Sequence, residues 1–150
     1  MLAQSINQRG SWPAAVAGVL LWLLSNPGNT ASDWQSPEQV PGTIAVSVEE
    51  ASRLHQQGVP FVDVRSARQY RKRHIAGAAH LDLKDGFTAE ALQGVAGKDG
   101  PLVIYCNGVM CSRSSRACEQ AVAWGFTKVH YFRGGITDWR RADLPVANAD

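Results

Sequence analysis

Residues 101–117 are Pro-Leu-Val-Ile-Tyr-Cys-Asn-Gly-Val-Met-Cys-Ser-Arg-Ser-Ser-Arg-Ala. Within them the run 102–105 is continuously apolar, which is typical of a β-strand that is covered on both faces. Asn107 and Gly108 come directly after Cys106, and because both residue types tolerate positive φ, the chain can turn sharply there. The segment therefore predicts a buried strand that ends in a cysteine and a tight loop.

A helix is expected directly after this loop, over residues 113–124, with Ser112 as its N-cap. The Cys106 thiol would then face the free backbone N–H groups of the loop and the positive end of the helix. Both favour the thiolate, which is the nucleophilic form of cysteine. We therefore predict that Cys106 is catalytic; the alternative is a buried core cysteine at the end of a strand.

Strand and helix signals alternate on both sides of this segment. The alternation predicts an α/β fold, with a mostly parallel five-stranded sheet and helices on both faces. Because ligands bind beyond the carboxyl ends of the strands in such folds, we expect Arg65, Cys106 and Arg133, which each follow a strand, to share one rim. The expected strands are 43–46, 61–64, 79–81, 102–105 and 129–132, and the expected helices are 47–57, 66–73, 88–95, 113–124 and 136–141.

Three separated motifs give the chain a family resemblance. They are VDVR at 62–65 with HIAGA at 74–78, VIYC at 103–106 with RSSRA at 113–117, and FRGGITDW at 132–139 with LPV at 144–146. In this order and spacing, over roughly residues 43 to 147, they resemble the rhodanese family of sulfurtransferases. The resemblance implies a rhodanese-like fold.

The resemblance also implies a role for Cys106. In that family the thiolate takes a sulfane sulfur from a donor such as thiosulfate and becomes a persulfide. It then passes the sulfur to a thiophilic acceptor, so the expected partners are a small anionic sulfur donor and a thiol or cyanide. A persulfide anion needs many hydrogen-bond donors, and a tight loop of N–H groups supplies them without a metal, a cofactor or a separate base. The expected substrate-binding residues are Asn107, Gly108, Val109, Met110, Cys111, Ser112 and Arg113.

Cys111 is the main departure from the commonest rhodanese loop, and the Arg113-Ser114 pair comes two residues later than is usual there. Cys111 is either a resolving thiol, able to attack a persulfide on Cys106 or to form a reversible disulfide, or a small solvent-facing residue without function. Arg113 is expected to bind an anionic donor, and the alternative is a solvated helix residue.

Two other functions fit a fold of this class. One is a redox or binding module in which Cys106 and Cys111 form a disulfide in an oxidising compartment. The other is a phosphatase or arsenate reductase, whose loop has five residues between a cysteine and an arginine. Here six residues separate Cys106 from Arg113, and Ser112 stands where that arginine would be, which counts against these enzymes.

Other polar residues have structural interpretations. The resemblance implies that Asp63 and Arg65 tie a strand end to neighbouring backbone. Cys118 lies on the core side of its predicted helix, and Trp139 is expected to pack the last helix on the sheet. A basic run on another predicted helix is either a solvated face or a source of attraction for anions; it consists of Arg68, Arg71, Lys72 and Arg73.

The N-terminal part of the chain differs from the rest. Residues 1–31 contain one charged residue, Arg9, and an apolar run at 12–24 followed by a polar exit, which is the pattern of a signal peptide. The predicted location is therefore the periplasm or another exported site, with a membrane anchor as the alternative. Residues 32–42 are expected to form a linker before the domain at 43–147. The chain without 1–31 has 14 basic and 13 acidic side chains, which does not suggest a nucleic-acid partner.

Overall fold

The computed structural model describes residues 34–149. The predicted export segment, residues 1–31, lies outside these residues. Within 34–149, no helix is both long and apolar enough to cross a bilayer.

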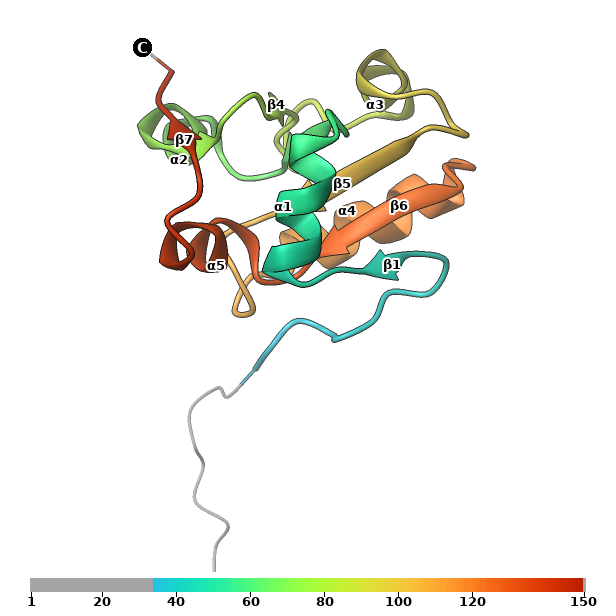
Figure 1. Ribbon diagram of the computed structural model, residues 1–150. Coiled ribbons are helices and arrows are strands. Elements are labelled where there is room, and N and C mark those ends of the chain that lie inside the picture. Colours follow the sequence, from blue (N-terminus) through green and yellow to red (C-terminus); the bar gives the residue numbers. More distant parts are fainter. Residues whose placement is uncertain (1–33, 150) are drawn as a thin grey trace, which may run out of the picture. The chain divides into compact units, whose positions relative to one another are not determined.

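The domain is built on one sheet of five parallel strands in the order β1-β6-β5-β2-β4 (Figure 1). The predicted sheet is confirmed, and every predicted strand and helix is present with ends that differ by one residue at most. The central strand is β5, as its continuous apolar run requires. The strands are β1 (Ile44–Ala45), β2 (Phe61–Asp63), β4 (Ala79–His80), β5 (Pro101–Tyr105) and β6 (Lys128–Phe132).

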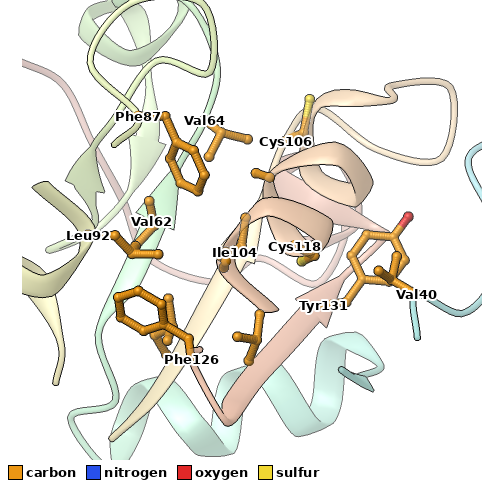
Figure 2. Packing of buried hydrophobic residues seen from close by; sticks show 14 residues of the cluster. Val40, Val62, Val64, Phe87, Leu92, Ile104, Cys106, Cys118, Phe126 and Tyr131 are labelled. Carbon is orange, nitrogen blue, oxygen red and sulfur yellow. The ribbon is translucent and has the colours of Figure 1, made fainter. Parts of the chain in front are cut away.

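Successive side chains of β5 point to opposite faces of the sheet and so enter two separate cores. Leu102 and Ile104 pack in the first core, which α3 and α4 cover, and Figure 2 shows part of this cluster. Val103 and Tyr105 pack in the second core beneath α1 and α5. The helices are α1 (Val48–Gln56), α2 (Ala67–Lys72), α3 (Ala89–Val95), α4 (Arg113–Ala123) and α5 (Gly135–Arg141).

A second, two-stranded sheet was not predicted. In it β3 (His74–Ile75) pairs antiparallel with β7 (Val146–Ala147). The N–H of Ala149 also donates to the carbonyl of Arg71 at 3.0 Å. The end of the described chain is thereby tied to α2. The pairing joins two segments that lie far apart in the sequence, and no local pattern encodes such a contact.

Residues 34–42 differ from the linker that we expected over 32–42, because they pack on the domain. Val40 is 1% exposed and belongs to the first core. The Tyr131 hydroxyl donates to the carbonyl of Pro37 at 3.1 Å. The N–H of Ser36 donates to the carbonyl of Val109 at 2.8 Å, which joins this segment to the loop after β5.

Candidate active site

Cys106 lies immediately beyond the carboxyl end of β5, with 1% of its surface exposed. Figure 2 shows its sulfur at the margin of the first core, pointing away from the aliphatic side chains. That sulfur is joined to Cys111 in a disulfide, and the two Cα atoms are 6.4 Å apart. The structure is therefore the oxidised form of the loop, and Cys106 must be reduced before it can act as a nucleophile.

The first turn of α5 holds the strand end in place. The N–H of Ile136 donates to the carbonyl of Cys106 at 3.0 Å, and the N–H of Thr137 donates to the carbonyl of Asn107 at 2.9 Å. Gly135 makes this approach possible, because its φ is +56° and a Cβ there would collide with the carbonyl oxygen of Cys106. The second glycine of the FRGG motif thus allows a helix to pack directly on the cysteine loop.

The loop after Cys106 is shaped through its carbonyl groups. The N–H of Cys111 donates to the carbonyl of Gly108 at 2.9 Å, and the hydroxyl of Ser36 donates to the carbonyl of Val109 at 3.0 Å. Several loop N–H groups find no acceptor among residues 34–149; they belong to Asn107, Gly108, Val109, Met110 and Ser112. All five are among the residues predicted to bind substrate, and that role stays a prediction; the N–H of Cys111, also predicted, is used within the loop.

A depression of about 420 Å³ opens beside this loop. Asp138 and Arg141 of α5 line it and form an ion pair at 3.1 Å, and sequence reasoning missed both, since no motif marks them as neighbours of the loop. Ser112 and Arg113 do not line the depression. The Nη1 atom of Arg113 is buried and has no hydrogen-bond partner within the described part of the chain.

A buried polar network connects β2 to the loop. Asp63 is fully buried, and its carboxylate accepts hydrogen bonds from the Arg65 guanidinium at 2.6 to 3.1 Å and from the Tyr105 hydroxyl at 2.8 Å. The Nη1 of Arg65 donates to Oδ1 of Asn107 at 3.2 Å, and Nε2 of Gln69 donates to the same oxygen at 3.3 Å. Arg65 of the VDVR motif therefore orients Asn107, the residue that follows Cys106, and it also ties the end of β2 to neighbouring backbone.

Tyr105 stays protonated in this network. Burial raises the pKa of Tyr105 strongly, and the negative charge of Asp63 raises it further. The hydroxyl therefore remains a hydrogen-bond donor to Asp63 and accepts from the N–H of Ile75 at 3.0 Å.

Arg133 shares the rim with Arg65 and Cys106 as predicted, because β2, β5 and β6 are neighbouring parallel strands that end at the same edge, but it does not line the loop depression. Its Nε donates to the carbonyl of Ser36 at 2.9 Å, and its Nη2 donates to Oε1 of Gln35 at 3.0 Å. The guanidinium is thus used to fasten the segment before β1 to the domain.

Cys118 is a core residue, as its helical position indicated. It is fully buried on α4, and burial raises the pKa of its thiol strongly. A neutral, packed thiol is a poor nucleophile. Cys106 and Cys111 are therefore the two cysteines whose chemistry the loop can support.

Comparisons with known proteins identify the family of the domain. Residues 47–142 match the model of the rhodanese-like domain family. Thiosulfate sulfurtransferase GlpE of Pseudomonas fluorescens is 36% identical over 95 residues, which cover 61% of this chain and 80% of that protein. The protein of the same name from Haemophilus influenzae is 30% identical over 104 residues, covering 69% and 94% of the two chains.

Solved structures show the same fold. The BH2092 protein of Bacillus halodurans superposes with a TM-score of 0.62 at 25% identity, over 70% of this chain and 77% of that one. The rhodanese-like domain of the Alr3790 protein from Anabaena gives a TM-score of 0.60 at 20% identity, over 69% and 78%.

Proposed function

The chain belongs to the rhodanese-like family, and from this premise we propose that it transfers a sulfane sulfur through a persulfide on Cys106. The donor is thiosulfate or a related small anion, and the acceptor is a thiol or cyanide. The observation that carries the proposal is the loop after Cys106, where five N–H groups have no acceptor within residues 34–149.

The chemistry follows from this loop. The Cys106 thiolate attacks the outer sulfur of thiosulfate, the sulfur–sulfur bond breaks, and sulfite leaves with the electron pair. The loop N–H groups stabilise the negative charge of the persulfide that remains. An acceptor thiolate or cyanide then attacks the outer sulfur, and the Cys106 thiolate leaves as the loop receives its charge again. The attacking group in each step is already an anion, so neither step requires a separate base.

The proposal is tested on reduced, desalted protein treated with thiosulfate. Mass spectrometry is expected to show a gain of one sulfur atom on the peptide that contains Cys106. The Cys106→Ser variant is expected to show none, and the Cys118→Ser variant serves as a matched control that still gains it. Thiocyanate formation from thiosulfate and cyanide measures the complete transfer.

Arg113 is the cation that the sequence predicts for the donor, and its Nη1 has no hydrogen-bond partner within residues 34–149, although Arg113 does not line the loop depression in the disulfide form. Arg141 is the competitor, because it lines the loop depression. One charge-assisted hydrogen bond is worth roughly 1.5–3 kcal/mol, so loss of the binding arginine raises KM for thiosulfate about tenfold or more. Comparing Arg113→Ala with Arg141→Ala in the thiocyanate assay identifies which one binds.

The Cys106–Cys111 disulfide supports a second candidate function, a redox module. In it the Cys111 thiolate attacks Sγ of the Cys106 persulfide, the disulfide forms, and hydrosulfide leaves with the outer sulfur. A dithiol reductant then returns both cysteines to thiols. Under this mechanism Cys111→Ser keeps persulfide formation but lengthens the lifetime of the persulfide, which time-resolved mass spectrometry measures. An unchanged lifetime would leave Cys111 without this role.

We also propose that residues 1–31 direct export and are removed or retained as an anchor. N-terminal sequencing of protein from the cell envelope tests this. A mature start between residues 24 and 33 supports a cleaved signal, whereas an intact Met1 in the cytosolic fraction contradicts export.

A further inference from the structure

A second hollow, of about 610 Å³, lies beside the loop between α2 and α5, and we call it the basic hollow. Its cations come from three places in the chain: Arg65 after β2, Arg68, Lys72 and Arg73 at α2, and Arg140 on α5. No carboxylate lines it. The complete lining is Arg65, Ser66, Arg68, Gln69, Lys72, Arg73, Asn107, Ile136, Thr137 and Arg140.

The cations of the basic hollow are available to a ligand. Arg68, Lys72, Arg73 and Arg140 are exposed, and none of them forms an ion pair within residues 34–149. Like charges that face one concave space repel one another and raise the local positive potential, which attracts anions. Arg65 is the exception, because Asp63 neutralises it.

We propose that the basic hollow binds the carboxylates of the sulfur acceptor, which is a small thiol bearing two or more carboxylates. This inference rests on the proposed sulfur transfer. Asn107 and Thr137 line both the basic hollow and the loop depression, so a molecule held in the hollow lies next to the reacting loop.

The size of the basic hollow favours this class of ligand. Its volume lies within the range of ~300–1,000 Å³ that is usual for small-molecule sites. Thiosulfate, with four heavy atoms besides its central sulfur, uses little of it and finds donors in the loop itself. Four unpaired cations fit a larger anion with several separated negative charges. The other substrate of the reaction is the acceptor, and an acceptor that carries several carboxylates would react through the sulfur of a thiol.

A solvated basic face does not account for this arrangement. Arg71 lies on the same short helix and is also exposed, but it does not line the basic hollow. Arg140 does line it, although it lies 68 residues beyond Lys72 in the sequence. Packing of α5 on the loop brings these charges together, which a run of basic residues on one helix does not.

The experiment compares mercaptosuccinate, a thiol with two carboxylates, with its uncharged dimethyl ester as acceptors from the persulfide enzyme. Wild type is expected to show a lower KM for the dicarboxylate. Lys72→Gln and Arg140→Gln should each raise that KM about three- to fivefold, as is typical of an exposed charge pair, and leave KM for the ester unchanged. Arg71→Gln is the matched control and should change neither KM.

Binding of S-methylmercaptosuccinate, which cannot accept sulfur, is measured separately by calorimetry or NMR titration. Its affinity should fall with Lys72→Gln and Arg140→Gln and persist with Arg71→Gln. Equal effects of all three substitutions, or no preference for the dicarboxylate, would overturn the basic hollow as the acceptor site. If the acceptor-site proposal fails but thiocyanate still forms, the proposed sulfur transfer stands. If the dicarboxylate binds at the basic hollow but no persulfide forms, the sulfur-transfer proposal fails instead.

Discussion

Gly135→Ala is expected to damage both the stability of the domain and the geometry of the cysteine loop. Gly135 has φ of +56°, where an L-residue costs about 1–2 kcal/mol. The new Cβ also collides with the carbonyl oxygen of Cys106, so α5 must move away from the loop. That movement breaks the bonds from Ile136 and Thr137, each worth about 0.5–1.5 kcal/mol. The free energy of unfolding should therefore fall by about 2–5 kcal/mol.

Gly58→Ala is the matched control for this substitution. Gly58 has φ of +78° with open space around its missing Cβ, so alanine there costs the backbone strain of about 1–2 kcal/mol alone. Urea unfolding of the reduced proteins gives both values, and the thiosulfate-induced mass gain reports the loop. Gly135→Ala should be the less stable variant and should form persulfide more slowly. Equal stability of the two variants, with an unchanged rate, would refute the idea that close packing of α5 holds the loop.

Three further predictions concern buried groups. Asp63→Ala leaves the Arg65 charge buried without its partner, so thermal or urea unfolding should show a loss of about 3–5 kcal/mol. In the reduced native protein a limiting alkylating agent should modify Cys106 before Cys118, as peptide mapping measures, because burial keeps the Cys118 thiol protonated; preferential modification of Cys118 would contradict the assignment of its environment. In the disulfide form, the pKa values of Cys118 and Tyr105 are raised by folding, so the unfolded state loses their protons at lower pH than the native state does. The free energy of unfolding should therefore fall as pH rises above about 8.5, and these two groups should not affect it below that pH. Urea unfolding between pH 7 and 10 measures this decline, which should be weaker in the Cys118→Ala variant.

The sequence was sufficient for the elements with contiguous signals. The continuous apolar run of β5 is complete within a few residues, and so is the Ser47-Val-Glu-Glu50 sequence, whose serine and last glutamate form a capping box at the start of α1. Cys106 and its loop were also predicted, because a strand, a turn and a helix follow one another there without interruption. The roles assigned to the loop residues stay predictions until persulfide formation is measured.

Other features depend on residues that are distant in the chain. The β3–β7 pair joins His74 to Ala147, and the segment before β1 reaches Val109 through Ser36, contacts that no local pattern encodes. Residues 34–42 carry the composition of a linker, with Ser36-Pro37 and Pro41-Gly42, and only their hydrogen bonds and the buried Val40 place them on the domain.

The chemistry of Cys106 can be inferred from its neighbours in the chain, since a strand end, turn-forming residues and a helix start are properties of adjacent residues. The surroundings of that cysteine cannot. Trp139 packs α5 on the sheet, as predicted, but only the structure shows that Gly135 then allows the first turn of α5 to touch Cys106. This long-range packing brings Arg140 opposite α2 and Arg141 beside the loop. The hydrophobic effect buries apolar side chains whatever their distance along the chain, so the neighbours of each side chain are decided only when the whole sheet has formed.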